Sequence, residues 1–174
     1  MLIRDATAAD AVSCAAVYAP YVQDTAVSFE LEAPSAAQMA ERIAAAQQGH
    51  AWLVVADARQ VLGYAYGGEF KSRAAYRFAC EVSVYLAPGL GRHGLGRALY
   101  DVLLPRLAQL GYHQAVAGMT LPNAASEGLH RALGFEPVGV YRAIGWKFER
   151  WHDVLFVQRP LLDSPDPPDP PALR

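Results

Sequence analysis

The sequence is poor in the residues that mark several large classes of protein. Its 174 residues include only two cysteines, Cys14 and Cys80, which lack the CxxC spacing of zinc-binding and redox motifs. Two such cysteines provide neither a disulfide framework nor a metal site. We therefore expect both to be small buried side chains of a protein in a reducing compartment.

Charge and long apolar runs are scarce as well. Only 18% of the residues are charged and the formal net charge is −2, so nucleic acid is not an expected partner. The segment from Met1 to Asp5 lacks the apolar core of a signal peptide. The run from Ala51 to Ala56 is far shorter than the roughly 20 residues of a membrane span. These absences predict a soluble, cytoplasmic protein without a membrane partner.

The remaining composition is that of a globular protein, with 53% hydrophobic residues. The length favours one domain with a substantial core, which we expect over residues 1–162. Residues 163–174 are rich in proline and aspartate and contain too little apolar surface to pack. We expect this tail to be disordered or polyproline-like.

Periodicity and turn residues predict the elements of the first half of the chain. Thr7 or Asp10 is expected to cap the first helix, whereas Ser35 and Gln38 match a capping box for the second. Gly67-Gly68 predicts a bulge or a bend. The expected elements are a strand at 2–4, a helix ending at Pro20 with Ala11, Val12, Ala15, Ala16 and Ala19 inward, an irregular segment at 21–34, a helix at 35–49, and hairpin strands at 52–56 and 61–66.

The second half continues this alternation. A strand beginning at Glu81 is followed by a helix to about Leu110, whose expected core face is Leu95, Leu99, Val102, Leu103, Leu107 and Leu110. Pro105 is expected to kink that helix. Next come a strand at 114–119, a helix at 123–133, and strands at 135–141 and 154–158 separated by an aromatic loop at 145–153. This order predicts an α/β fold, a mixed sheet with helices on both faces.

A glycine-rich segment lies between the strand at Glu81 and the following helix. It reads Gly91-Arg92-His93-Gly94-Leu95-Gly96-Arg97. Free backbone N–H groups and the macrodipole at a helix N-terminus favour an anion such as a phosphate. The glycine spacing excludes both the dinucleotide-binding G-x-G-x-x-G pattern and the P-loop.

The segment is similar to the [QR]-x-x-G-x-[GA] loop of the GCN5-related N-acetyltransferases (GNAT). Asn123 after the next strand and the ending Leu133-Gly134-Phe135 strengthen this resemblance, which covers roughly residues 2–160. Gly91 departs from the family's Gln or Arg, although Arg92 follows it with a positive charge. Four separated stretches also resemble the phosphinothricin and methionine sulfoximine/sulfone acetyltransferases, namely 71–76, 81–85, 121–123 and 145–154.

The resemblance implies a GNAT fold with acetyl-CoA as co-substrate and without a metal. Asn123 either caps its helix or contacts the cofactor. The alternative for Arg92, His93 and Arg97 is that they are ordinary solvated surface charges that do not contact the cofactor. The implied contacts are main-chain bonds from Val84, Tyr85 and Leu86 to the pantetheine arm, and pyrophosphate contacts from Arg92, His93, Gly94, Leu95, Gly96 and Arg97.

The resemblance also implies two catalytic residues. Glu81 matches the proposed general base, acting through water, unless it is a solvent-facing residue at a strand end. His130 occupies the position of the family's thiolate-protonating tyrosine. The alternative for His130 is a structural histidine bonded to backbone.

An anionic amino acid requires hydrogen-bond donors. Lys71, Arg73 and Tyr76 are the expected donors, unless they form an ordinary charged loop, and Phe29 is expected to be an apolar lid. Trp146 and Trp151 are expected to line the pocket, a dimer interface or the core.

The expected function is transfer of an acetyl group from acetyl-CoA to the α-amine of a small amino acid. Phosphinothricin, methionine sulfoximine and methionine sulfone are the expected kind, and transfer is expected to be direct, in a ternary complex and within a homodimer. The alternatives are an acetyltransferase for a protein N-terminus or a polyamine, or a non-catalytic acyl-CoA sensor.

Overall fold

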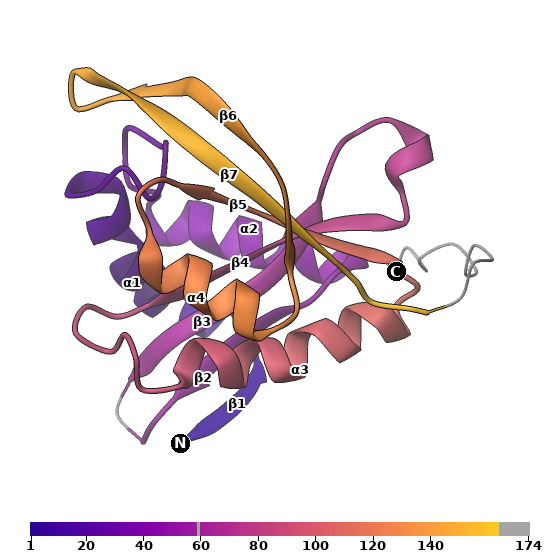
Figure 1. Cartoon of the computed structure of the whole chain (residues 1–174). Helices are drawn as coiled ribbons and strands as arrows, with labels where there is room; N and C mark the ends of the chain where they lie inside the picture. Colours follow the sequence, from indigo (N-terminus) through magenta and orange to yellow (C-terminus); the bar gives the residue numbers. More distant parts are fainter. Residues whose placement is uncertain (59, 164–174) are drawn as a thin grey trace.

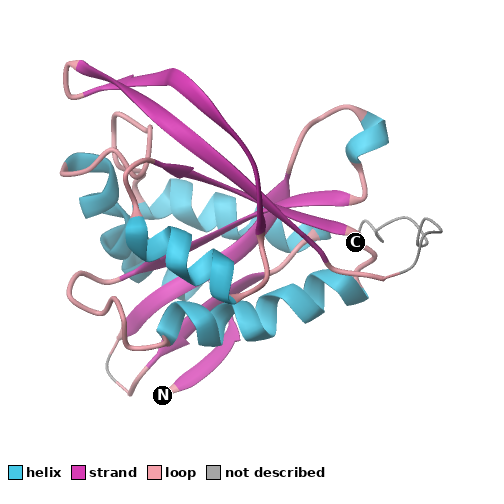
Figure 2. Ribbon diagram, viewed as in Figure 1, coloured by secondary structure: helices cyan, strands magenta, loops and turns pink. Residues whose placement is uncertain are grey.

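The computed structural model describes residues 1–58 and 60–163, so the predicted tail lies almost wholly outside the described residues. Strands and helices alternate in the predicted order (Figures 1 and 2). The elements are β1 (Leu2–Asp5), α1 (Ala11–Gln23), α2 (Ala36–Gly49), β2 (Trp52–Ala56), β3 (Val61–Glu69), β4 (Ala79–Leu86), α3 (Leu95–Gln109), β5 (Gln114–Thr120), α4 (Ala124–Ala132), β6 (Glu136–Lys147) and β7 (Arg150–Pro160), with short 3-10 turns η1 (Ala8–Asp10) and η2 (Ala74–Tyr76).

The strands form one mixed sheet in the order β1-β2-β3-β4-β5-β7-β6. β4 and β5 are its parallel pair, whereas the other neighbours are antiparallel. Within the described residues, the pairing of β4 with β5 ends at Glu81 and Val116. β4 then continues to Leu86 and β5 to Thr120, so the two strands separate beyond Glu81.

The helices cover both faces of the sheet, as predicted. α3 and α4 lie on one face, and α1 and α2 lie on the other (Figure 1). Two buried clusters fill the two interfaces, and burial of their apolar surface is the main stabilising contribution. The α3-side cluster includes Cys80, Val82, Leu99, Leu103 and Leu107, and the α1–α2-side cluster includes Val17, Met39, Ile43, Val54 and Tyr64.

Asp10 is the N-cap residue of α1 but makes no side-chain capping hydrogen bond there, and it forms a capping box with Thr7 around η1 instead. Thr7 precedes η1, and the Asp10 carboxylate accepts a hydrogen bond from the Thr7 backbone N–H at 2.8 Å. Both terminal nitrogens of Arg4 donate hydrogen bonds to the same carboxylate, each at 2.7 Å. These donors, Arg4 first, lower the pKa of Asp10 to about 2. The capping box of α2 is also present, because Ser35 and Gln38 exchange hydrogen bonds.

The predicted end of α1 at Pro20 is wrong. The helix continues to Gln23, and the Asp24 backbone N–H donates to the Pro20 carbonyl at 2.9 Å. The predicted inward face is also wrong in part, because Val12 is 67% exposed whereas Tyr18 and Val22 are buried. Burying these two larger side chains, one of them beyond the proline, offsets the backbone bond that Pro20 cannot make.

The core face of α3 differs from the prediction at three positions. The predicted Leu95, Leu99, Leu103 and Leu107 are buried, but Val102 is 40% exposed. Tyr100 and Leu104 are buried in its place. The buried face of α3 is therefore shifted from Val102 toward Tyr100, whose ring contacts His130 of α4.

The predicted bulge at Gly67-Gly68 is wrong as well. β3 continues through both glycines, which pair with Val82 and Glu81, and the irregular register lies at Val55 and Ala56 instead. A Cβ atom on Gly67 would lie 2.8 Å from Leu107 Cδ2. Gly67 therefore permits the close approach of α3 to the sheet.

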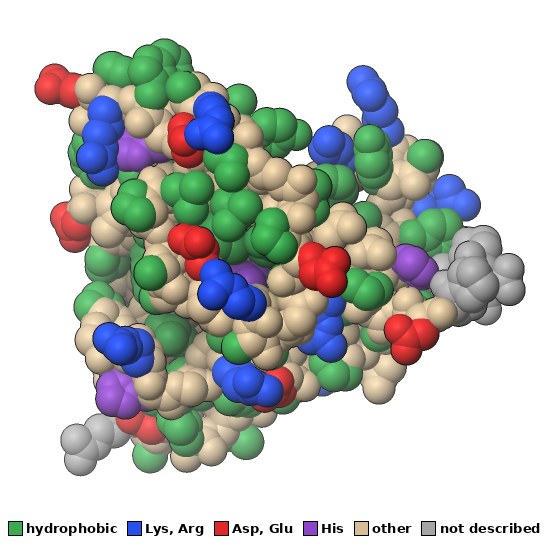
Figure 3. All heavy atoms as spheres, in the orientation of Figure 1, with side chains coloured by type: hydrophobic (Ala, Val, Ile, Leu, Met, Phe, Trp, Pro, Cys, Tyr) green, Lys and Arg blue, Asp and Glu red, His purple; other side chains and the backbone are tan. Residues whose placement is uncertain are grey.

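The segment predicted as an aromatic loop is the end of a β-hairpin. β6 and β7 continue through it and are joined by Phe148 and Glu149, with φ angles of 51° and 57°. Positive φ at both central residues is the requirement of a type I′ turn, whose usual Asn-Gly or Asp-Gly signal is missing here. Exposed apolar side chains cover this hairpin (Figure 3), among them Val138, Tyr141, Ile144, Trp146, Phe148 and Trp151.

Both cysteines are free thiols and completely buried, as predicted. Burial raises the pKa of each thiol to about 12, which disfavours the reactive thiolate. Within the described residues, every helix is too short or too polar to cross a membrane. The same residues contain no group of three or more His, Cys, Asp or Glu side chains that could hold a metal ion.

The contact between Gly67 and Leu107 gives a stability prediction. Gly67→Ala is expected to lower the free energy of unfolding by about 1–3 kcal/mol, because the added methyl overpacks a filled interface. Gly68→Ala is the matched control, since its Cβ would meet only Tyr66 Cε2 at 3.9 Å. Denaturant unfolding measures both variants, and equal stability of the two would contradict this role of Gly67.

Candidate active site

Glu81 lies where β4 and β5 separate. Its strand neighbours Cys80 and Val82 belong to the α3-side cluster, so strand alternation directs Glu81 to the α1–α2 face. Glu81 is half-buried, and this burial raises the pKa of its carboxyl group. A carboxylate with a raised pKa at the mouth of an opening is suited to accept a proton.

A cavity of about 360 Å³ lies on the same face, between β3 and α2, and we call it the β3–α2 cavity. Gly68 lines it and is the register partner of Glu81, so the cavity lies against the strand pair that carries Glu81, although Glu81 is not among its lining residues. Tyr66 also lines it, and its strand register partner is Ser83. The other lining residues are Tyr18, Met39, Arg42, Ala45, Ala46, His50, Trp52, Tyr64, Gly67 and Glu69.

His130 lies on the opposite face, buried in α4 with 4% exposure. Its Nδ1 is 2.8 Å from the Ser126 carbonyl oxygen, which can only accept, so Nδ1 carries the proton. Its Nε2 is 3.3 Å from the Tyr100 hydroxyl oxygen and accepts a hydrogen bond from that hydroxyl. Burial lowers the pKa of His130, so the geometry favours a neutral imidazole.

Tyr100, which was not predicted as a site residue, contacts His130 and lies near enough to Glu81 to feel its charge. It is completely buried in α3, and its pKa is raised first by burial and also by the charge of Glu81. Its ring packs edge-on against His130, with 5.5 Å between centroids. The signal was present in the sequence, because Tyr100 shares helical spacing with Leu103, Leu104 and Leu107.

The glycine-rich segment forms the predicted turn at the N-terminus of α3. Gly94 is the N-cap residue with φ 77°, and among the described residues no side chain caps this end. Arg92 also has a positive φ of 68°. The first backbone N–H groups of α3 therefore face the loop, and Arg92, His93 and Arg97 are exposed beside them. This arrangement is suited to bind an anion.

The glycines of this segment have different roles. A Cβ on Gly96 would lie 3.2 Å from Leu129 Cδ2, so Gly96 allows α4 to pack on α3. Gly94 is needed for its backbone angle, whereas a Cβ on Gly91 would meet nothing within 4 Å. The departure from the family pattern at Gly91 therefore leaves the shape of the turn unaffected.

Asn123 caps α4, which was one of its two predicted roles. Its side-chain oxygen accepts a hydrogen bond from the Ser126 backbone N–H at 3.1 Å. Contact of Asn123 with a cofactor stays a prediction. On β4, the Leu86 carbonyl already accepts a hydrogen bond from the Tyr21 hydroxyl at 2.7 Å.

The predicted acceptor-binding residues fall into two places. Lys71 lies over the ring of Tyr76, with 5.3 Å from Nζ to the centroid, and Arg73 precedes the same short turn η2. Phe29 lies apart, in the α1–α2 loop, and its ring is 6.0 Å from that of His152 in β7. Figure 1 shows η2 and the α1–α2 loop on opposite sides of the molecule.

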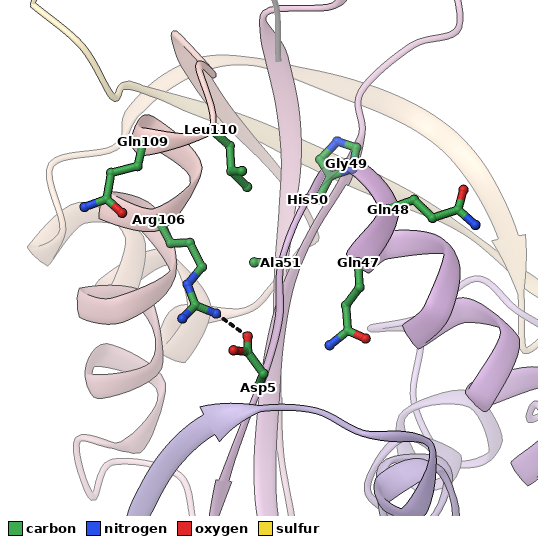
Figure 4. A pocket seen from close by; sticks show the side chains of 9 residues that line it. All are labelled: Asp5, Gln47, Gln48, Gly49, His50, Ala51, Arg106, Gln109 and Leu110. Atoms are coloured by element: carbon green, nitrogen blue, oxygen red, sulfur yellow. Dashed lines mark hydrogen bonds and ion pairs between the residues drawn. The ribbon is translucent and has the colours of Figure 1, made fainter. Parts of the chain in front are cut away.

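A second cavity of about 480 Å³ lies between the C-terminal ends of α2 and α3 (Figure 4). An ion pair between Asp5 and Arg106 crosses one side of it. It contains no predicted site residue. The lining is polar and includes Gln47, Gln48, His50 and Gln109.

Comparison with known proteins agrees with this geometry. The model of the acetyltransferase (GNAT) domain matches residues 3–156. A phosphinothricin N-acetyltransferase of Alcaligenes faecalis is 39% identical over 87% of this chain and 78% of its own length. An L-methionine sulfoximine/L-methionine sulfone acetyltransferase of Pseudomonas paraeruginosa is 40% identical over 90% of this chain and 92% of its own.

A solved structure is similar over nearly the whole fold. The phosphinothricin acetyltransferase of Sinorhizobium meliloti, crystallised with AcCoA, superposes with a TM-score of 0.91 at 40% identity, covering 97% of this chain and 93% of that one. The chain belongs to the GNAT family of acetyltransferases, which confirms the family resemblance and the predicted fold.

The contacts of His130 give a spectroscopic prediction. The ring is expected to stay neutral and protonated at Nδ1 to a pH below the ordinary imidazole pKa of about 6.5, because burial disfavours the charged form. Nitrogen NMR of histidine-labelled protein measures the tautomer, and His130→Asn identifies the signal. Tyr100→Phe is expected to change the chemical shift of Nε2, because it removes the hydrogen bond to that atom, and to leave the tautomer unchanged. A ring protonated at Nε2 would contradict the assignment.

Proposed function

We propose that this protein transfers the acetyl group of acetyl-CoA to the α-amine of a small amino acid such as phosphinothricin, methionine sulfoximine or methionine sulfone. The observation that carries the proposal is the place of Glu81, a half-buried carboxylate where β4 and β5 separate, beside the β3–α2 cavity. The names of the relatives support both the reaction and the acceptor class.

Acetyl-CoA is the co-substrate, bound along the open edge of β4. The pyrophosphate lies on the N–H groups of Leu95, Gly96 and Arg97, with Arg92 and His93 adding positive charge or donors. Backbone groups of Val84 and Tyr85 bind the pantetheine arm as an added strand would. Leu86 contributes less through its carbonyl, because Tyr21 already donates to that oxygen.

The reaction begins when Glu81, directly or through water, accepts a proton from the ammonium group of the acceptor. The free amine attacks the thioester carbonyl carbon, the carbon–sulfur bond breaks, the nitrogen gives up its second proton, and the departing thiolate takes up one proton. His130 and Tyr100 form the second proton-handling pair at this site. Direct transfer in a ternary complex is supported by the buried thiols of Cys14 and Cys80, with pKa values of about 12.

The acceptor is anionic in this proposal. Lys71, Arg73 and Tyr76 bind its carboxylate and its phosphinate or sulfone oxygens, and the Arg73 guanidinium is suited to two parallel hydrogen bonds. Phe29 packs on Gly145 of β6, away from this cluster, so its contribution is to hold the α1–α2 loop rather than to contact the acceptor. A basic cluster of this kind disfavours polyamines as substrates, since they carry positive charge.

The experiment is a thiol-release assay across amino acids and their sulfone, sulfoximine and phosphinate analogues. Glu81→Gln is expected to lower kcat about 10²–10⁴-fold, the contribution of a general base. Glu41→Gln removes an exposed carboxylate from α2 and is the matched control. Full kcat in Glu81→Gln would contradict the role of Glu81. Tight acetyl-CoA binding without turnover of any amino acid would favour an acyl-CoA sensor.

The raised pKa of Glu81 gives the sign of two pH effects. Activity is expected to fall as the pH falls through this raised value, because the protonated carboxyl cannot accept a proton. Stability changes in the opposite sense, since the folded state disfavours the charged form and loses stability as the pH rises through that pKa. Glu81→Gln is therefore expected to raise the melting temperature at neutral pH, with the difference vanishing below about pH 4.

The protein is proposed to act as a homodimer in the cytoplasm. Exposed apolar side chains gather on the hairpin of β6 and β7, and β6 is an edge strand, a combination that marks protein–protein interfaces. The two free thiols are consistent with a reducing compartment.

Sedimentation velocity tests the dimer. The wild-type chain is expected to sediment as a dimer, and Trp151→Glu is expected to yield monomers because it places a charge on the apolar hairpin. Leu31→Glu changes an even more exposed apolar residue in the α1–α2 loop and is expected to leave the dimer intact. A monomeric wild-type protein would contradict the proposal.

A further inference from the structure

Lys147 is a buried ammonium group that the proposed reaction does not use. It lies at the end of β6 with only 5% exposure. Its Nζ donates to the Val22 carbonyl at 2.6 Å and to the Ser28 carbonyl at 2.7 Å. Burying a charged amine is costly unless it is hydrogen-bonded, so these two contacts are required for Lys147 to be stable in this place.

The two acceptors of Lys147 lie in different segments. Val22 is in the last turn of α1, and Ser28 is in the following loop, residues 24–35. Lys147 therefore joins the hairpin of β6 and β7 to the end of α1 and to the loop that follows it. The pairing is long-range, spanning 125 and 119 residues.

Phe29 makes a second attachment between the same two segments. A Cβ on Gly145 would lie 2.1 Å from Phe29 Cε2, so the ring lies directly on the β6 backbone. Gly145 is the residue that leaves room for this ring. The loop is thus held against the hairpin by one polar contact and one apolar contact, one residue apart in the loop.

The same loop holds two side chains of the β3–α2 cavity. Ser28 Oγ is 2.7 Å from the Tyr18 hydroxyl, which donates to Glu30 Oε1 at 2.9 Å. The Glu30 carboxylate in turn accepts hydrogen bonds from both terminal nitrogens of Arg42, at 2.7 and 2.8 Å. Tyr18 and Arg42 line the cavity beside Glu81. A continuous chain of contacts therefore runs from Lys147 through the loop to the cavity wall.

We infer that Lys147 is a positioning residue for acceptor binding. By fixing the loop at residues 24–35, it sets the place of Tyr18 and Arg42, and hence the shape of the β3–α2 cavity. The inference rests on the proposed function in one respect, that this cavity receives the amino-acid acceptor. The N-terminus of α3 lies outside this chain of contacts, so pyrophosphate binding there is expected to be independent of Lys147.

Steady-state kinetics on the full-length protein test the inference. Lys147→Met keeps the length of the side chain and removes both hydrogen bonds. It is expected to raise the KM of the acceptor about ten- to a hundredfold, because the side chains that line the cavity would be displaced. The KM of acetyl-CoA is expected to be unchanged. Arg142→Met removes an exposed charge from the same strand and is the matched control. Equal changes in both KM values, or none, would overturn the inference.

Tyr18→Phe tests the same chain of contacts if Lys147→Met folds poorly. It removes the hydroxyl that contacts Ser28 and Glu30 and keeps the ring in the core. The same selective rise in the acceptor KM is expected, since Tyr18 is the next member of the chain. An unchanged acceptor KM in Tyr18→Phe would overturn the inference.

Hydrogen exchange separates this inference from the proposed function. In Lys147→Met, amides of residues 24–35 are expected to exchange faster than in the wild type, whereas those at the start of α3 are not. Unchanged exchange in the loop would overturn the positioning role even if the enzyme is active. Absence of turnover by the wild type with every amino acid would refute the proposed function and leave the exchange result to decide whether Lys147 fixes the loop.

Discussion

The structure depends on one interruption of hydrogen bonding, the end of the β4–β5 pairing at Glu81 and Val116. Unpaired strand edges are unfavourable unless another group satisfies them. Each strand keeps a full antiparallel partner on its other side, β3 for β4 and β7 for β5. The opening is therefore held by the rest of the sheet, and it supplies backbone groups that a ligand can pair with.

This opening connects two chemically different sides of the sheet. The α1–α2 side carries Glu81 and a cavity with mostly aromatic and small apolar lining. The α3–α4 side carries the turn at Gly94 and the buried pair of Tyr100 and His130. Glu81 and the pair of Tyr100 and His130 thus lie on opposite sides of the sheet, which suits the proposed transfer, in which one proton leaves the amine and another reaches the sulfur.

Local signals predicted the elements and their order well. The capping box at Ser35 involves two residues three positions apart, so it can be recognised from the sequence alone. The exposed position of Val102 was not predicted, because packing against α4 decides which side of α3 is buried. The long hairpin was not predicted, because its turn lacks the Asn-Gly signal. Within the candidate site, Tyr100 and Lys147 escaped prediction because their roles depend on partners 30 or more residues away. Glu81 was found through family resemblance, since nothing in its own neighbourhood distinguishes it.

The buried cysteines have a consequence for an enzyme that releases a thiol. In the proposed reaction each turnover frees coenzyme A, which oxidises in air to a disulfide that exchanges with accessible protein thiolates. Cys14 and Cys80 are completely buried, and their pKa values of about 12 keep them protonated. The folded chain therefore resists mixed-disulfide formation with its own product, and its activity should be insensitive to the redox state of the coenzyme A pool.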